Sequence, residues 1–471
     1  MPEFTLDELL RATLGDAEIS GKHETFLGVS IDSREVKDGE IFFALTGPNF
    51  DGHDFAHAAA LKGARGIVAS RAIRTSDLPC GVWVIRVDDT LKALQRLAHY
   101  NRSRFGALVV AVTGSTGKTS TKDMIYSIFA RRMETTRTYQ NFNNEIGVAL
   151  TLLGLEKYHE ACIVELAMRA PGEIRELSEI VRPDMGVITN VGESHIELLG
   201  SLDNIAKAKS ELIEVLGEDG VAVLNGDCPH TAKMKDMVQG RAVLFGLEDS
   251  NEARGKDMVN LGKDGTQFTV EYGRRSFPVH VPVPGIHNVY NALAAAAVAL
   301  VSGLDTRAIT EGLANLELTF QRMDIQEAPS GFTLIDDTYN ASPSSVNAAL
   351  HVLEDIRGTK RRAIAVLGDM LELGHIAETA HRNIGKAVIE RSVDVLITVG
   401  DLARLTGQEA VRLGMNRDTV FAFNEKSQAI DTLRKLVSPG DVILVKGSRS
   451  MEMEEISKTL LESIGGGPHV S

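Results

Sequence analysis

Short, β-branched apolar runs alternate with amphipathic segments along most of the chain. A continuous apolar run of this kind is typical of a parallel strand that is covered on both faces. Segments whose apolar residues return every three or four positions are typical of helices that pack on such a sheet. The alternation therefore predicts an α/β protein with mostly parallel sheets, and the pattern divides the chain into three units.

The first unit, residues 1–104, is predicted to be a small α/β domain. It opens with an acidic amphipathic helix over Met1–Asp16, with Thr5 as a candidate N-cap residue. The expected strands lie at 29–34, 40–45, 67–69 and 82–87, and the further helices at 54–62 and 90–103.

The second unit, residues 105–318, continues the alternation of strands and helices and is expected to contain a mostly parallel sheet. The strands expected here lie at 108–112, 162–166 and 185–191. Helices are expected from Lys118 onward, over 201–216 and over 288–302.

The third unit, residues 319–471, renews the pattern and predicts a doubly wound, Rossmann-like domain. Its first strand is not followed by G-x-G-x-x-G, which argues against dinucleotide binding. Strands are expected at 332–336, 363–367, 395–399 and 442–445, and helices from about Pro343, Ile376, Asp401, Glu425 and Ser450.

Composition narrows the class of protein. A chain of 471 residues with 43% hydrophobic and 24% charged residues is typical of a globular protein with several domains. The net charge of −14 and the lack of a basic run argue against extended nucleic-acid binding. Three scattered cysteines make neither a disulfide framework nor a CxxC site, and the longest apolar run, Ala292–Val301, is too short to span a bilayer. We expect a cytoplasmic protein without membrane insertion.

The chemistry centres on a glycine turn between the strand 108–112 and the helix from Lys118. Such a turn presents backbone N–H groups and a helix N-terminus to an anion, while Lys118 reaches the β- and γ-phosphates and Thr119 can hold Mg²⁺. The spacing is shorter than the usual P-loop, because Val112 stands where the first Gly would be, so an ordinary strand-to-helix turn is the alternative. The residues expected at the nucleotide phosphates are Gly114, Ser115, Thr116, Gly117, Lys118, Thr119 and Ser120.

Three residues beyond this turn are candidates for catalysis. Glu165 ends a predicted strand, where open α/β sheets place their ligands, and we favour a Mg²⁺ ligand over a carboxylate in solvent. His195 follows another strand end, but a single His is more often a packed or solvated loop residue. Lys209 lies on a predicted helix, where a surface ion pair with a nearby Glu is the default interpretation.

Taken together, these residues belong to a series of motifs that resembles the Mur ligase family, the ATP-dependent amide-forming enzymes of peptidoglycan precursor synthesis. The motifs occur in family order over nearly the whole chain, at 113–119, 141–147, 164–166, 189–195, 206–209, 285–291, 336–343 and 446–450. The stretches 141–145, 367–374 and 446–454 are similar to the members that add D-alanyl-D-alanine. The Asp-Asn-Pro-Arg signature of the diaminopimelate-adding members is absent.

The resemblance implies a role for each matching residue. ATP would be bound at its phosphates by Lys118 and Arg322 and at its ribose by Asp337. Its adenine would be bound by either Asn288 or Asn291. One Mg²⁺ would be held by Thr119 and Glu165, and a second by His195 and a carbamylated Lys209. The acceptor would contact Asn143 and Asn144, and its uridine end would contact Ser33, Arg34, Thr46, Asp51 and His53 of the first unit.

A carbamate makes chemical sense at Lys209, because an ammonium would repel Mg²⁺ whereas a carbamate offers anionic oxygens. The family resemblance further implies a two-step reaction. A carboxylate of UDP-MurNAc-tripeptide attacks the γ-phosphate of ATP, and the amine of D-alanyl-D-alanine then displaces phosphate from the acyl phosphate. The third unit would close over ATP about hinges near 104–107 and 318–321. We expect a monomer.

Some of these residues have simpler interpretations. Asn288 and Asn291 could be N-cap and first-turn residues of a helix, Asp337 could start a turn, and Arg34 could form a surface ion pair. Ala167 and Arg169 depart from the Gly and small polar residue expected after Glu165. Rival functions are another Mur or folylpolyglutamate-type ligase and, from another class, a P-loop regulatory ATPase, although no Asn-Lys-x-Asp guanine signature occurs.

Overall fold

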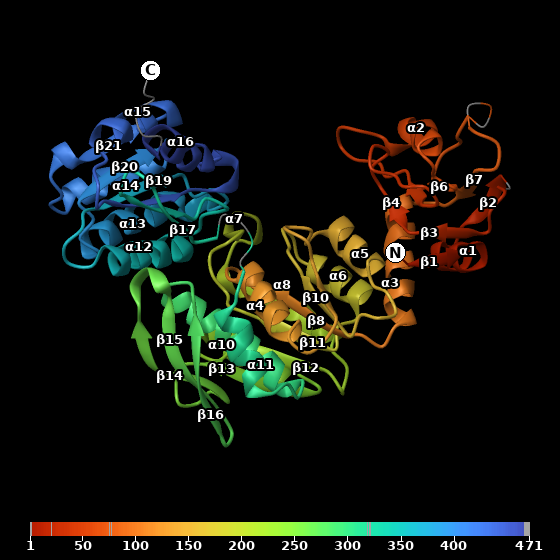
Figure 1. The fold of residues 1–471 in the computed structure, drawn as a ribbon, viewed down its shortest axis with the longest axis horizontal. Coiled ribbons are helices and arrows are strands. Elements are labelled where there is room, and N and C mark those ends of the chain that lie inside the picture. The colour runs from red at the N-terminus through yellow and green to blue at the C-terminus, as the bar shows by residue number, and fades with distance from the viewer. Residues whose placement is uncertain are drawn as a thin grey trace.

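Three α/β units, each built on its own main sheet, make up the protein (Figure 1). The computed structural model describes residues 2–19, 21–74, 76, 78–317, 319 and 322–465, with side chains as far as residue 462. We call the units N-terminal (β1 to α3), central (β8 to α11) and C-terminal (from Arg322, just before β17, to α16). The central unit lies between the other two in Figure 1, and the predicted fold class is confirmed.

The N-terminal unit has a five-stranded sheet in the order β2-β7-β6-β5-β4 and a separate antiparallel pair, β1 and β3. The predicted first helix is wrong in extent, because β1 precedes it, although Thr5 does cap it in a capping box with Glu8. The elements are β1 Glu3–Thr5, α1 Leu6–Thr13, β2 Asp16–Ile19, β3 Thr25–Leu27, β4 Val29–Ser30, β5 Ile41–Phe43, η1 Gly52–Phe55, α2 Ala56–Leu61, β6 Gly66–Ala69, β7 Trp83–Arg86 and α3 Thr90–Arg104.

Helix α3 joins the N-terminal unit to the central unit. Its buried Asn101 side chain donates hydrogen bonds from Nδ2 to the carbonyl oxygens of Leu152 (2.8 Å) and Leu155 (3.1 Å), at the end of α5 in the central unit. A buried amide that satisfies two carbonyls in this way fixes the helix in one position on its neighbour. The predicted hinge at 104–107 begins where α3 ends, at Arg104.

The central unit contains a nine-stranded sheet in the order β16-β15-β14-β13-β12-β11-β8-β10-β9. Its elements are β8 Leu108–Thr113, α4 Lys118–Phe129, β9 Thr135–Arg137, α5 Glu145–Leu153, β10 Ala161–Glu165, α6 Glu173–Val181, β11 Met185–Ile188, α7 Ile196–Leu199, α8 Leu202–Val215, β12 Val221–Asn225, α9 Pro229–Lys233, η3 Met234–Met237, β13 Arg241–Gly246, β14 Ala253–Asn260, η4 Gly262–Asp264, β15 Thr266–Tyr272, β16 Arg275–Val281, α10 Ile286–Val301 and α11 Thr306–Ala314.

Strand β8 is the centre of the candidate site, because it pairs in parallel with β10 on one side and β11 on the other. The carboxyl ends of these three strands therefore meet at one edge of the sheet, where ligands bind in open α/β folds. The antiparallel hairpins β14–β15 and β15–β16 were not predicted. Their strands alternate buried and exposed residues and lack the continuous apolar runs that identify parallel strands.

The C-terminal unit is a doubly wound domain whose sheet has the order β17-β18-β22-β19-β20-β21, parallel except for the edge strand β17. Its elements are β17 Asp324–Glu327, β18 Thr333–Asp336, α12 Pro343–Arg357, β19 Ala363–Gly368, η5 Gly374–Ile376, α13 Ala377–Glu390, β20 Val395–Val399, α14 Ala403–Arg412, η6 Arg417–Thr419, β21 Val420–Phe423, α15 Lys426–Leu436, β22 Val442–Lys446, η7 Arg449–Met451 and α16 Glu454–Gly465.

The second predicted hinge and the prediction about membrane insertion can be compared only with the described residues. Within the second predicted hinge, Leu318, Phe320 and Gln321 lie outside the described residues. Across the part of the chain that is described, every helix is too short or too polar to cross a membrane.

Candidate active site

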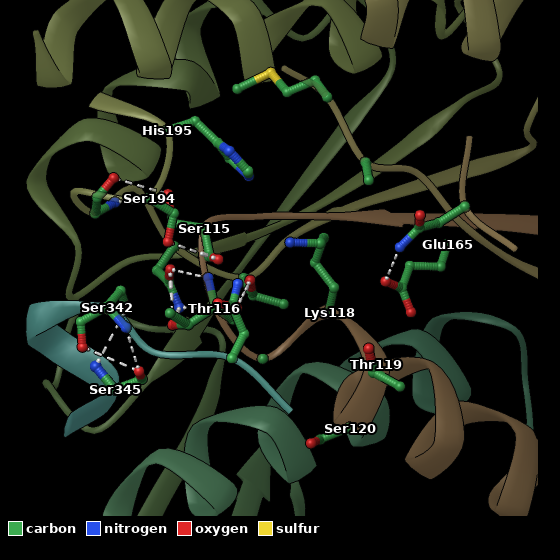
Figure 2. Close-up of a pocket in the computed structure, with 18 of the residues that line it drawn as sticks. Ser115, Thr116, Lys118, Thr119, Ser120, Glu165, Ser194, His195, Ser342 and Ser345 are labelled. Carbon is green, nitrogen blue, oxygen red and sulfur yellow. Dashed lines mark hydrogen bonds between the residues drawn. The ribbon is translucent and has the colours of Figure 1, made fainter. Parts of the chain in front are cut away.

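A cavity of about 1020 Å³ lies where the central and C-terminal units meet, and α3 contributes Leu91 and Gln95 to its wall. The carboxyl ends of β8, β10 and β11 open into it. Figure 2 shows Lys118 in this cavity with His195 on one side and Glu165 on the other. Of the predicted phosphate-binding residues, Ser115 to Ser120 line the wall, and Gly114 lies directly before them.

The glycine turn has the predicted arrangement of strand, loop and helix. Helix α4 begins at Lys118, and Gly117 at its N-cap adopts the left-handed conformation with φ +79°. Asn190, which follows β11, fixes the loop, because its Oδ1 accepts a hydrogen bond from the backbone N–H of Thr116 (3.0 Å). The loop is thus held at the N-terminus of a helix, a position that favours an anion.

Gly114 has no room for a side chain. Its φ is +151°, and a Cβ atom would lie 1.9 Å from Oγ1 of Thr189. Strain of this kind costs about 1–3 kcal/mol. We expect Gly114→Ala to weaken ATP binding by at least about tenfold in titration calorimetry. Gly106→Ala is the matched control, because a Cβ there meets no atom within 4 Å, and equal affinity losses in the two variants would contradict the prediction.

The amine of Lys118 points back over the loop and donates a hydrogen bond to the carbonyl oxygen of Gly114 (2.9 Å). Burial lowers the pKa of Lys118, the carboxylate of Glu165 opposes this shift, and the guanidinium of Arg322 adds to it. A partly buried cation beside a second cation attracts a polyanion such as a triphosphate.

Glu165 ends β10 with its side chain buried. Its Oε1 accepts a hydrogen bond from Nδ2 of Asn143 (2.7 Å), and its backbone N–H donates to Oγ1 of Thr138 (3.0 Å). Its Oε2 is buried and has no hydrogen-bond partner within the described residues. An orphaned carboxylate oxygen is costly unless a cation fills the position, so the site fits a metal ligand and not the solvent-exposed alternative.

His195 lies at the N-terminus of the short helix α7 with φ +64°. Its Nδ1 is 2.6 Å from Oε2 of Glu372 in the C-terminal unit, although the ring N–H is not aligned for a hydrogen bond. Burial lowers the pKa of His195, and the charge of Lys118 lowers it further, against the effect of Glu372. The imidazole is therefore favoured in its neutral form, which is the form that binds a metal.

Lys209 is buried in α8, which rules out the surface ion pair that was its default interpretation. It does not line the cavity itself. Burial lowers the pKa of Lys209 well below its usual value, and repulsion from Lys118 lowers it further. These conditions favour the neutral amine that carbamylation requires.

Asn288 and Asn291 both line the cavity from the first two turns of α10. The N-cap interpretation of Asn288 is wrong, because Gly285 occupies that position. Nδ2 of Asn288 donates to the carbonyl oxygen of Pro284 (2.8 Å), and Nδ2 of Asn291 donates to Oδ1 of Asn288 (3.2 Å). A Cβ on Gly117 would lie 2.4 Å from Oδ1 of Asn291, so α10 approaches the phosphate loop too closely for a side chain there.

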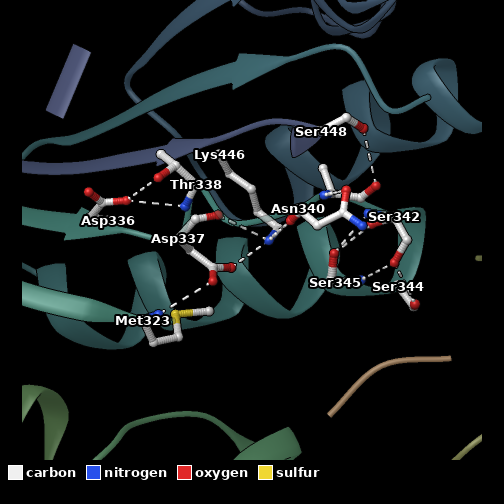
Figure 3. Close-up of polar contacts among 11 residues, drawn as sticks. Met323, Asp336, Asp337, Thr338, Asn340, Ser342, Ser344, Ser345, Lys446 and Ser448 are labelled. Carbon is white, nitrogen blue, oxygen red and sulfur yellow. Dashed lines mark hydrogen bonds and ion pairs between the residues drawn. The ribbon is translucent and has the colours of Figure 1, made fainter. Parts of the chain in front are cut away.

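The C-terminal unit contributes Arg322 and Asp337, as the sequence predicted. Nη2 of Arg322 donates to Oγ1 of Thr119 (3.3 Å), and its guanidinium stacks 3.8 Å over the ring of Tyr339. Asp337 follows β18 and is held by Lys446, whose Nζ is 2.5 Å from Oδ2 of Asp337 (Figure 3). The pKa of Lys446 is lowered by burial, against the effect of Asp337.

The candidate uridine-binding residues of the N-terminal unit do not line the cavity. Oδ1 of Asp51 lies 2.5 Å from Nδ1 of His53 and 3.4 Å from the hydroxyl of Thr46, so these three form one cluster after β5. Arg34 forms an ion pair with Asp32, which agrees with its simpler interpretation as a surface ion pair. Hydrogen bonds from Arg34 lower the pKa of Asp32 to about 2. Ser33 lies in the same turn.

Asn143 and Asn144, the other candidate substrate residues, do line the cavity. Asn144 also caps α5, because its Oδ1 accepts from the backbone N–H of Gly147 (2.9 Å). Asn190, Thr138 and Lys446 were not predicted as site residues from the sequence. Asn190 and Lys446 lie at strand ends within the family motifs 189–195 and 446–450, which could have identified them. Thr138 follows the short edge strand β9 and lies in no such motif.

Protein side chains alone do not complete a metal site. Within the described residues, no group of three or more His, Cys, Asp and Glu side chains is arranged to hold a metal ion. Glu165 and His195 therefore need further oxygen donors, such as a hydroxyl, a phosphate or a modified side chain.

Comparisons with known proteins agree on one family. Three family models match: "Mur ligase family, catalytic domain" at residues 25–102, "Mur ligase middle domain" at 112–299 and "Mur ligase, glutamate ligase domain" at 321–449. A UDP-N-acetylmuramoyl-tripeptide–D-alanyl-D-alanine ligase of Bacillus subtilis is 37% identical over 97% of both chains.

Solved structures give the same result. MurF from Acinetobacter baumannii has a TM-score of 0.89 at 31% identity and covers 98% of this chain and 99% of its own. MurF ligase from Thermotoga maritima in complex with ADP has a TM-score of 0.81 at 27% identity, covering 93% of this chain and 97% of its own.

Proposed function

Because the chain belongs to the Mur ligase family, we propose that it joins D-alanyl-D-alanine to UDP-N-acetylmuramoyl-tripeptide at the expense of ATP. The names of full-length relatives in the D-alanyl-D-alanine-adding branch support this reaction and its place in peptidoglycan precursor synthesis. The ADP bound to the T. maritima relative supports ATP as the nucleotide.

The observation that carries the proposal is the shared cavity. It brings Lys118 and Glu165 of the central unit together with Arg322 and Asp337 of the C-terminal unit. Two anions, a triphosphate and a carboxylate, must approach each other for phosphoryl transfer. The cations on two walls of one cavity supply the charge that this approach needs.

In the first step, a carboxylate oxygen of the acceptor attacks the γ-phosphorus and ADP leaves, which gives an acyl phosphate. Lys118 and Arg322 neutralise the charge that develops on the phosphate oxygens. In the second step, the amine of the dipeptide attacks the acyl carbon and phosphate leaves. Closure of the C-terminal unit over ATP would exclude water, which would otherwise hydrolyse the acyl phosphate.

We assign Glu165 and Thr119 as ligands of one Mg²⁺. His195 is assigned to a second Mg²⁺, which a carbamate on Lys209 would support. Bound divalent cations would shield the phosphate charge and orient the reacting oxygens. The unpartnered Oε2 of Glu165 and the depressed pKa values of His195 and Lys209 support this assignment.

The remaining assignments concern the whole chain. The cluster of Thr46, Asp51 and His53 is proposed to hold the uridine end of the acceptor, in a domain of residues 1–104. ATP is assigned to residues 105–318 and the closing domain to 319–471. Since one chain supplies every wall of the cavity, we propose a monomer that works in the cytoplasm, where ATP and nucleotide-linked precursors are available.

The experiment is a phosphate-release assay on the purified protein with ATP, Mg²⁺ and UDP-MurNAc-tripeptide. We expect release to depend on added D-alanyl-D-alanine. Dependence on diaminopimelate, lysine or glutamate would instead indicate another ligase of the family, and release that needs neither amine nor acceptor would indicate a P-loop ATPase.

A further inference from the structure

A buried carboxylate holds the segment that joins the central and C-terminal units. Between α11 and β17 the structure describes 315–317, 319, 322 and 323. Thr319 donates two hydrogen bonds to Oδ2 of Asp123 on α4, one from its backbone N–H (2.9 Å) and one from its hydroxyl (2.7 Å). The side chain of Asp123 is 0% exposed, so water does not compete for these bonds.

The charge of Asp123 is balanced on its other oxygen. Oδ1 accepts a hydrogen bond from Nη1 of Arg137 (2.7 Å) and lies 3.3 Å from Nζ of the buried Lys122. Arg137 is itself held, because its guanidinium lies 4.2 Å from the ring centroid of Tyr126. A buried carboxylate is tolerated only when it is paired in this way, and the pairing leaves it fixed in position.

The same helix also meets the joining segment at a second point. Three residues beyond Thr319, Arg322 donates to the hydroxyl of Thr119, and it stacks on Tyr339. Thr119 and Asp123 are four positions apart on α4 and therefore lie on one face, one turn from each other. The segment thus contacts the phosphate-loop helix at both Thr319 and Arg322.

We propose that Asp123 is a positioning residue, which anchors Thr319 and thereby sets Arg322 at the phosphate end of the cavity. This inference rests on the proposed function, in which Arg322 stabilises the phosphoryl-transfer transition state. Without the anchor, Thr319 and Arg322 gain conformational freedom that each turnover must remove. The defect should therefore affect turnover more than ground-state nucleotide binding.

The first test compares Thr319→Val with Thr319→Ser. Val removes the hydroxyl donor and keeps the branched shape, whereas Ser keeps the donor. We expect Thr319→Val to lower kcat about tenfold, as the loss of a hydrogen bond to a charged group implies, with the Kd for ADP changed less than about twofold. Thr319→Ser should restore kcat, and Thr432→Val on α15, away from the cavity, is the control.

A double-mutant cycle with Arg322→Ala gives the decisive readout. If Asp123 acts through Arg322, Thr319→Val should have no further effect on kcat in the Arg322→Ala background. An equal loss in both backgrounds, a wild-type kcat for folded Thr319→Val, or a parallel loss of ADP affinity would each overturn the proposal. Thr319→Ala replaces Thr319→Val in the cycle if the latter does not fold.

The cycle also separates this inference from the proposed function. If phosphate release by the wild-type protein needs an amine other than D-alanyl-D-alanine, the proposed function fails. The same cycle run with that amine still decides whether Asp123 and Thr319 position Arg322.

Discussion

Replacing Lys118 with Ala is expected to lower kcat by about 100- to 1,000-fold, which is the usual cost of removing one group that stabilises transition-state charge. The partly buried Lys118 lines the cavity, where the charge of Arg322 acts on its amine. Steady-state kinetics of D-alanyl-D-alanine-dependent phosphate release measures the loss.

The fold should survive this substitution. Burial disfavours the charged form of Lys118, so its removal takes away a destabilising group, and the melting temperature should not fall. Lys118→Arg is the matched variant: it keeps the charge but replaces a point cation with a planar fork, and we expect partial activity. Full activity in Lys118→Ala would contradict the assignment of the phosphate loop.

The second large effect is expected at Lys209. We expect Lys209→Ala to lower kcat roughly 100-fold, at the upper end of losses when support for a metal ligand is removed. The wild-type protein should also show a carbamate signal in ¹³C NMR with labelled bicarbonate, and the variant should lack it. The depressed pKa of Lys209 favours the neutral amine that this modification needs.

Lys207→Ala on the same helix is the control, because Lys207 is exposed and Lys209 is buried. A small carboxylate such as acetate should partly rescue Lys209→Ala, since it can occupy the space of the missing carbamate. Basal nucleotide hydrolysis unaffected by Lys209→Ala would favour the regulatory ATPase.

Several parallel strands were predictable because they are buried on both faces and appear as continuous apolar runs, although β12 and β13, which also pair in parallel, were not among the predicted strands. Strand β8 and the start of α4 at Lys118 were placed correctly for this reason. The hairpins of β14 to β16 were not, because one face of each is polar and the apolar run is interrupted. The first helix was predicted too long, because β1 pairs with the distant β3, which local periodicity does not reveal.

The candidate site was predictable where a residue type and a strand end coincide, as at Glu165 and Asp337. Lys209 lies four residues after Ile205 and three before Leu212, on the buried face of α8, but its residue type favoured a surface ion pair as the default interpretation. Contacts between units could not be predicted from the sequence either. Neither the approach of Glu372 to His195 nor the anchoring of Thr319 by Asp123 follows from any local pattern.

The measurement that tests the account most directly is oxygen transfer from the acceptor. UDP-MurNAc-tripeptide labelled with ¹⁸O in the reacting carboxylate is converted in the presence of ATP, Mg²⁺ and D-alanyl-D-alanine, and the products are analysed by mass spectrometry. Attack of the carboxylate on the γ-phosphate predicts ADP and inorganic phosphate that carries one ¹⁸O atom. Unlabelled phosphate, or AMP and pyrophosphate as products, would contradict the acyl phosphate on which the account rests.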